Sequence, residues 1–146
     1  MSDFRTLSES VLASPQITPG DIAAAQAEGV TLIVNNRPEG EAEDQTPGAE
    51  IEAAARAAGL DYVAIPIGGS GFGEPQVSAM ADALACAEGK VLAYCRSGTR
   101  STLLWALAQA HGGADPEEIA AAAAAAGYDV MPVRPAIDML AARARG

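Results

Sequence analysis

The sequence predicts an α/β domain with a small, mainly parallel sheet flanked by helices. Three observations support this fold class. Short apolar runs rich in β-branched residues alternate with helical segments, prolines and glycines mark where those segments begin and end, and most links are short. We find no linker within the 146 residues, so we expect one domain spanning 1–146.

The first half of the chain contains the clearest helix start. Thr18-Pro19-Gly20-Asp21 combines a capping threonine, a proline suited to the first turn and an aspartate suited to the positive helix end, and Gly29 closes the segment. A buried strand is expected over 30–34, and a second helix over 46–58. Val11-Leu12-Ala13 is a candidate edge strand before them.

The second half repeats the same alternation. Strands are expected at 61–65 and 91–94, separated by a helix that Pro75 opens and Gly89 ends. A helix over 101–110 follows the second of these strands directly. Two more helices complete the chain, at 115–127 and 135–143.

Two longer connections interrupt the short links. They run from Asn35 to Gln45 and from Pro66 to Glu74, and each follows a strand. Ligand sites in open α/β sheets lie at the carboxyl ends of strands, so both connections are expected to edge a binding site. Asn36 and Arg37 are therefore candidate substrate contacts. The acidic residues that follow them, Glu39, Glu41 and Asp44, have a solvated loop as the alternative to a role as acids.

Composition narrows the possible partners. The formal net charge of −10 makes nucleic acid and anionic membrane surfaces unlikely partners, and no apolar run is long enough to span a membrane. The polar start of the chain does not resemble a secretory signal, so we expect a cytoplasmic protein. One histidine and two cysteines provide too few ligands for a zinc site, and we expect no metal and no cofactor.

The chemistry is expected in the loop Tyr94-Cys95-Arg96-Ser97-Gly98-Thr99-Arg100-Ser101, between a strand and a helix. Free backbone N–H groups at such a turn form an anion site, to which Arg96, Ser97, Gly98 and Thr99 are expected to contribute. Arg100 offers a planar fork of donors for an oxyanion. The same positive field favours the thiolate of Cys95, so we predict that Cys95 is a nucleophile. Ser101 is the third catalytic candidate, as a donor to that thiolate.

This loop resembles those of two enzyme families. Four residues separate Cys95 from Arg100, as in rhodanese-like sulfurtransferases, whereas cysteine-dependent phosphatases have five. Gly98 and Ser101 are similar in kind to the phosphatase pattern, although Tyr94 stands where a phosphatase usually has histidine.

The wider sequence resembles one family over residues 3 to about 140. The segments 14–18 and 35–41, together with the Cys95 loop, are similar to the bacterial phosphatase-like domain DUF442, the phosphatase-like part of beta-lactamase hydrolase-like proteins. This resemblance implies a dual-specificity-phosphatase-like fold with a P-loop. It also implies a link to sulfide metabolism and a partner of the persulfide dioxygenase type.

Three functions remain open at this point. A sulfurtransferase carrying a Cys95 persulfide is favoured, because phosphate ester hydrolysis needs a general acid and the Pro66–Glu74 connection has no aspartate. A phosphatase with a phosphocysteine intermediate is the alternative, with an acid from Glu39, Glu41 or Asp44. A non-catalytic anion-binding module is the third. The substrate is expected to be a small oxyanion or a persulfide.

The second cysteine, Cys86, lies inside a predicted helix and is assigned to packing. A disulfide with Cys95 is the alternative role for its thiol.

Overall fold

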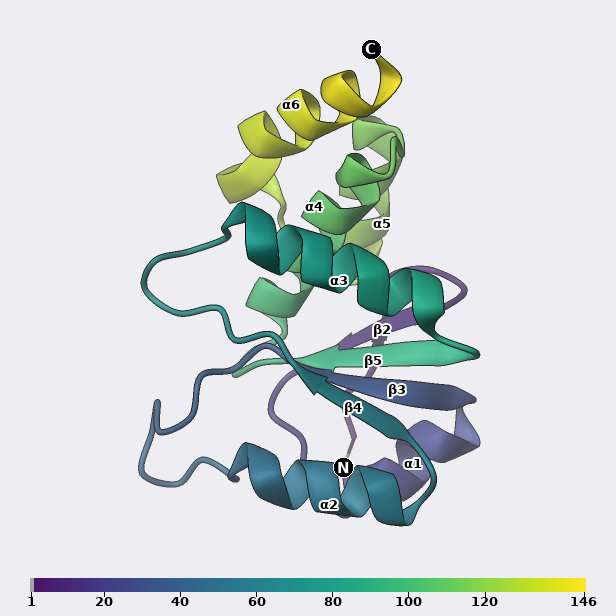
Figure 1. Ribbon diagram of the computed structural model, residues 1–146, viewed down its shortest axis with the longest axis vertical. Helices are drawn as coiled ribbons and strands as arrows, with labels where there is room; N and C mark the ends of the chain where they lie inside the picture. Colours follow the sequence, from purple (N-terminus) through teal and green to yellow (C-terminus); the bar gives the residue numbers. More distant parts are fainter. Residues whose placement is uncertain (1) are drawn as a thin grey trace.

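A five-stranded sheet lies between two layers of helices (Figure 1). The computed structural model describes residues 2–146. The strands, in chain order, are β1 (Arg5–Thr6), β2 (Val11–Ser14), β3 (Val30–Asn35), β4 (Asp61–Ala64) and β5 (Lys90–Tyr94). Their order across the sheet is β1-β2-β5-β3-β4, with β1 antiparallel to β2 and all other neighbours parallel. The expected fold class is thus confirmed.

The helices divide between the two faces of the sheet. Helices α1 (Asp21–Ala27) and α2 (Gly48–Ala57) lie on one face (Figure 1). The other face carries α3 (Glu74–Cys86), α4 (Thr99–His111), α5 (Pro116–Ala125) and α6 (Arg134–Arg145), with a short 3₁₀ turn, η1 (Met131–Val133), leading into α6. The helices that connect the strands return the chain to the end of the sheet at which the previous strand began. The four longer strands, β2 to β5, are therefore parallel.

The central strand β5 separates two apolar cores. Its side chains alternate, with Val91 and Ala93 in the core under α3 to α6, and Leu92 and Tyr94 in the core under α1 and α2. This alternation directs Tyr94 and the next residue, Cys95, to opposite faces.

Helix α4 is buried almost along its whole length. Of its residues, Ser101 to Ala108 and Ala110 are all buried, because the sheet, α3, α5 and α6 surround it. A helix buried on every side has no polar face, so its sequence shows little amphipathic pattern. The start of α4 is therefore held rigidly against the end of β5.

Several boundaries differ from those expected. Helix α4 begins at Thr99, two residues earlier than predicted, because Gly98 itself forms the cap with a φ of +91°. Strand β1 was not predicted, since its two residues are too few to give a pattern. No helix in the described part of the chain is long and apolar enough to cross a membrane.

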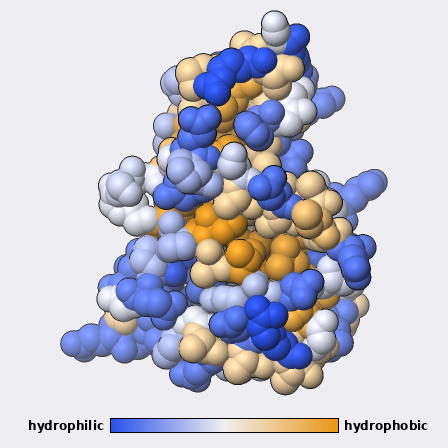
Figure 2. Space-filling model, viewed as in Figure 1, coloured by the Kyte–Doolittle hydropathy of each residue, from blue (hydrophilic) through white to orange (hydrophobic). Residues whose placement is uncertain are grey.

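Apolar side chains reach the surface between α3 and the sheet edge at β4 (Figure 2). A shallow cavity there is lined by Leu32, Val63, Ala83 and Cys86, among others. Cys86 is exposed, so its assignment to interior packing was wrong.

Candidate active site

Cys95 lies at the carboxyl end of β5 and is completely buried. The backbone N–H of Gly98 donates a hydrogen bond to its Sγ atom over 3.1 Å. A backbone donor aimed at sulfur stabilises a thiolate more than a neutral thiol. The role of Cys95 as a nucleophile stays a prediction, and the Gly98 N–H contact is the geometry that supports it.

The loop that follows Cys95 is held at several points. Cys95 N–H donates to the Ser14 carbonyl at the end of β2 (3.3 Å), and the hydroxyl of Thr102 donates to the Gly98 carbonyl (2.9 Å). Within the described part of the chain, the N–H groups of Arg96, Ser97 and Arg100 have no hydrogen-bond partner. Free N–H groups at the start of a helix form an anion cradle.

The side chains of the cradle lie largely in solvent. Arg96, Ser97 and Thr99 are exposed, and the Ser97 hydroxyl donates to that of Thr99 over 3.0 Å. Any contact of these residues with an anion therefore depends mainly on their backbone groups, which remains a prediction.

Arg100 is anchored by Glu41, which comes from the long connection after β3. The Nη1 and Nη2 atoms donate to the two Glu41 oxygens over 2.7 and 2.9 Å, and Nη1 also donates to the Ile67 carbonyl over 2.8 Å. The hydrogen bonds with Glu41 raise the pKa of Arg100, and the nearby Cys95 sulfur contributes in the same direction. In the described residues Nε has no partner, so the Nε–Nη2 side of the guanidinium is free to bind an oxyanion.

Glu41 also binds Arg37, which lies two residues after the end of β3 in the same connection. Arg37 is 5% exposed and donates from Nε to Glu41 (2.9 Å) and from Nη1 to Gln16 (3.0 Å). The hydrogen bond from Arg100 is the largest cause that lowers the pKa of Glu41 to about 2, with Arg37 adding to it. The Nε and Nη1 atoms of Arg37 thus serve Glu41 and Gln16, whereas Nη2 has no partner in the described residues, so a direct contact of Arg37 with substrate stays a prediction.

Asn36 connects the end of β3 to the start of α4. It is fully buried, its side-chain nitrogen donates to the Ile65 carbonyl (2.9 Å), and its side-chain oxygen accepts from the Ser101 hydroxyl (2.8 Å). The prediction that Asn36 contacts substrate is not supported, because its amide nitrogen and oxygen are engaged with Ile65 and Ser101.

Ser101 has a different partner from the one expected. Its hydroxyl has one proton, and that proton is directed to Asn36, whose orientation is fixed by Ile65. The predicted donation from Ser101 to the Cys95 thiolate was therefore wrong in this structure. Ser101 instead ties the first turn of α4 to the end of β3.

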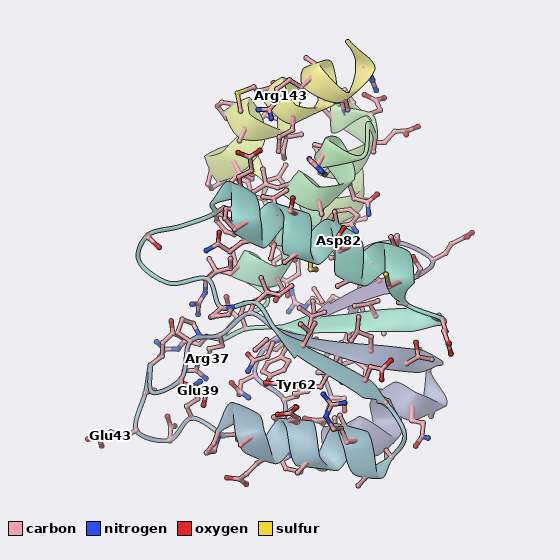
Figure 3. The ribbon with its side chains drawn as sticks, viewed as in Figure 1. Arg37, Glu39, Glu43, Tyr62, Asp82 and Arg143 are labelled. Atoms are coloured by element: carbon pink, nitrogen blue, oxygen red, sulfur yellow. The ribbon has the colours of Figure 1, made fainter. Side chains whose placement is uncertain are left out.

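Two of the three carboxylates proposed as acids, Glu39 and Glu41, are engaged in other contacts. Glu41 is ionised and bound to two arginines, and both oxygens of Glu39 accept from the Gly48 N–H at the start of α2 (3.0 and 3.2 Å). Asp44, the third proposed acid, is exposed and makes no side-chain hydrogen bond in the described part of the chain, so its role as an acid stays a prediction. Its neighbour Glu43 lies at the tip of the loop and points away from the sheet, whereas Arg37 lies at the sheet end (Figure 3). Glu74 begins α3 and is exposed, as expected for a residue at a helix start.

Cys86 cannot form a disulfide with Cys95. It ends α3 beside the amino-terminal end of β5, and the five residues of β5 span about 16 Å. A disulfide needs Cα atoms within about 7 Å. Both cysteines are free thiols, so the alternative role for Cys86 was wrong.

Sequence analysis missed Glu41 as an arginine anchor and Tyr128 as a contact of the loop. Tyr128 donates from its hydroxyl to the Ser97 carbonyl over 3.1 Å. The only available signal for Glu41 was its four-residue spacing from Arg37. Nothing local to Tyr128 indicates that it reaches a loop 31 residues earlier.

Comparisons with known proteins identify the family of this chain. The model of the phosphatase-like domain of beta-lactamase hydrolase-like proteins matches residues 3–112. The beta-lactamase hydrolase-like protein of Xylella fastidiosa is 41% identical over 104 residues, which are 70% of this chain and 24% of that protein. The chain thus spans about a quarter of the length of that relative.

Solved structures give the same fold. A provisionally named phosphatase from Neisseria meningitidis is 32% identical, with a TM-score of 0.82 over 94% of this chain and 98% of that one. PTPMT1 is 14% identical, with a TM-score of 0.71 over 97% and 98% of the two chains. The expected dual-specificity-phosphatase-like fold is confirmed, and the chain belongs to the family of phosphatase-like domains of beta-lactamase hydrolase-like proteins.

Proposed function

We propose that this chain hydrolyses phosphomonoesters through a phosphocysteine formed on Cys95. The observation that carries the proposal is the geometry around the buried Cys95 thiol. The Gly98 N–H points at the sulfur, and the Nε–Nη2 side of Arg100 is free to bind an oxyanion. The chain also belongs to a family of phosphatase-like domains. The finding that the comparisons favour phosphatases over sulfurtransferases reverses the order of preference drawn from the sequence.

The proposed reaction has two steps. The Cys95 thiolate attacks phosphorus, a P–S bond forms, and the P–O bond to the leaving group breaks with its electron pair on oxygen. Water then attacks the phosphocysteine, which releases phosphate and restores the thiolate. In both steps the free N–H groups and the Nε–Nη2 side of Arg100 bind the phosphoryl oxygens, where negative charge is concentrated.

The leaving group sets a limit on the substrates. Glu41 is ionised at neutral pH because its pKa is about 2, and Glu39 serves as a helix cap, so neither supplies a proton. An oxygen that leaves without a proton must be a stable anion, as a phenolate is. With Glu39 and Glu41 excluded, we expect aryl phosphates to react much faster than alkyl phosphates, and Asp44→Asn should not change this ratio.

Sulfur transfer is the second candidate, and the four-residue spacing between Cys95 and Arg100 favours it. In that reaction the thiolate attacks the outer sulfur of thiosulfate, the S–S bond of the donor breaks, and sulfite leaves with the electron pair. The persulfide on Cys95 then passes its outer sulfur to an acceptor thiol. No proton donor is needed, which agrees with the engagement of Glu39 and Glu41 in other contacts.

One experiment separates the candidates. The reduced protein is incubated in parallel with p-nitrophenyl phosphate and with thiosulfate, and phosphate release and intact mass are recorded. Cys95→Ser tests the nucleophile, and Cys86→Ser is the matched control because that thiol lies at the other end of the sheet.

Phosphate release that Cys95→Ser abolishes and Cys86→Ser retains supports the phosphatase. A gain of one sulfur atom on Cys95 without phosphate release overturns that proposal in favour of sulfur transfer. If neither reaction occurs while inorganic phosphate still binds, the chain is an anion-binding module and both catalytic proposals fail.

A further inference from the structure

The peptide group between Ser97 and Gly98 connects the Cys95 sulfur to a residue far away in the sequence. Its N–H donates to Cys95 Sγ over 3.1 Å, and its carbonyl accepts from the Tyr128 hydroxyl over 3.1 Å. The two ends of a trans peptide point in opposite directions. A side chain that fixes the carbonyl therefore also fixes the direction of the N–H that reaches the sulfur.

Gly98 does not fix this peptide by itself. Its φ of +91° is in the left-handed region, and glycine adopts positive and negative φ about equally well. A rotation of the peptide by about half a turn would need only changes at Ser97 and Gly98, and it would point the carbonyl oxygen toward the sulfur. The orientation seen here thus depends on a partner outside the loop.

Tyr128 is packed closely enough to be that partner. It is 9% exposed, and a Cβ atom placed on Gly98 would overlap the tyrosine hydroxyl, so only glycine leaves room for the contact. Arg5 lies over the Tyr128 ring at 5.2 Å and also donates to the Ala126 carbonyl over 3.4 Å. The first strand and the segment after α5 together hold the ring against the loop.

We propose that Tyr128 is a positioning residue that stabilises the Cys95 thiolate through the Ser97–Gly98 peptide. The proposal rests on the proposed role of Cys95 as a nucleophile and adds a residue beyond the segment that the family model matches, 3–112. The hydroxyl acts in two ways. It holds the N–H in line with the sulfur, and by polarising the carbonyl it makes that N–H a stronger donor.

The test is the pH profile of Cys95 alkylation by iodoacetamide, measured in a Cys86→Ala background so that only one thiol reacts. Tyr128→Phe removes the hydroxyl and keeps the ring. Tyr94→Phe is the matched control, because the Tyr94 hydroxyl is buried without a partner in the described residues and faces the other core. Thermal unfolding of each variant is recorded alongside.

We expect the midpoint of the alkylation profile to move up by roughly half a pH unit or more in Tyr128→Phe, the effect of one lost hydrogen bond. Tyr94→Phe should leave the midpoint in place. A midpoint that Tyr128→Phe does not move overturns the proposal, even if the variant unfolds at a lower temperature, because a purely structural residue would do that too. The readout needs no phosphate ester, so an inactive wild-type protein with a shifted midpoint in Tyr128→Phe would refute the proposed function and keep this inference.

Discussion

Replacing Glu41 by Gln should destabilise the fold in a pH-dependent way. The change keeps the size of the side chain and removes the charge that binds Arg100 and Arg37. The Arg100 pair is partly exposed, with side chains 24% and 29% accessible, so its loss should cost no more than about 1 kcal/mol. Arg37 is buried and would lose its only carboxylate partner in the described residues, which should cost roughly another 1–2 kcal/mol.

The total of about 2 kcal/mol at pH 7 corresponds to a fall in Tm of roughly 6 °C for a domain of this size. The direction in which the stability difference changes with pH follows from the pKa of Glu41. This pKa is lowered from an ordinary value of 4.5 to about 2 in the folded protein. A lowered carboxyl pKa stabilises the fold above the ordinary value, and this contribution is lost as pH falls toward 2.

Urea unfolding of both proteins between pH 7 and pH 2.5 measures this difference. The gap in unfolding free energy between wild type and Glu41→Gln should be constant above pH 5 and should shrink below it. A gap that is absent at pH 7, or one that stays constant down to pH 2.5, would refute the assignment of Glu41 as the counter-ion of both arginines.

Three further changes test other parts of the site. Arg100→Lys should keep the Tm within a few degrees but lower kcat/KM for p-nitrophenyl phosphate by roughly 100-fold. The reason is that a single ammonium group cannot bind Glu41 on one side and an oxyanion on the other, as the guanidinium can. A loss of less than threefold would contradict this. Asn36→Ala should reduce the unfolding free energy, measured in urea, by about 2 kcal/mol, because it leaves the Ser101 hydroxyl and the Ile65 carbonyl buried without partners. An unchanged urea midpoint would show that these two hydrogen bonds are dispensable for stability. Cys86→Ser should leave both turnover and Tm nearly unchanged, and a large loss of turnover would mean that this thiol has a role in the site.

The fold was predictable because its signals are local. The run Val91–Tyr94 is apolar and β-branched at its start, and Gly89 and Pro75 mark boundaries through their own backbone preferences. These features depend on neighbours in the chain, so they can be interpreted from one sequence. The two-residue strand β1 has no such signal and forms only because β2 offers it an edge.

The site was predictable only in part, for a related reason. Cys95 and Arg100 belong to one turn, and a turn followed by a helix determines where its N–H groups point. The roles of Asn36, Ser101 and Glu41 depend instead on which groups meet across 60 or so residues. Sequence spacing indicated that Asn36 lies near the loop, but not that its amide would take the Ser101 proton.

The positions of the two cysteines determine how this protein can respond to oxidants. A thiolate at an active site reacts with peroxide, and its first product, a sulfenic acid, is preserved if a thiol or a backbone nitrogen condenses with it before further oxidation makes the change irreversible. Cys86 lies at the opposite end of β5, about 16 Å of strand away, and is the only other cysteine in the chain. Recovery of oxidised Cys95 therefore requires a thiol from another molecule, and that thiol must be small enough to reach a fully buried sulfur.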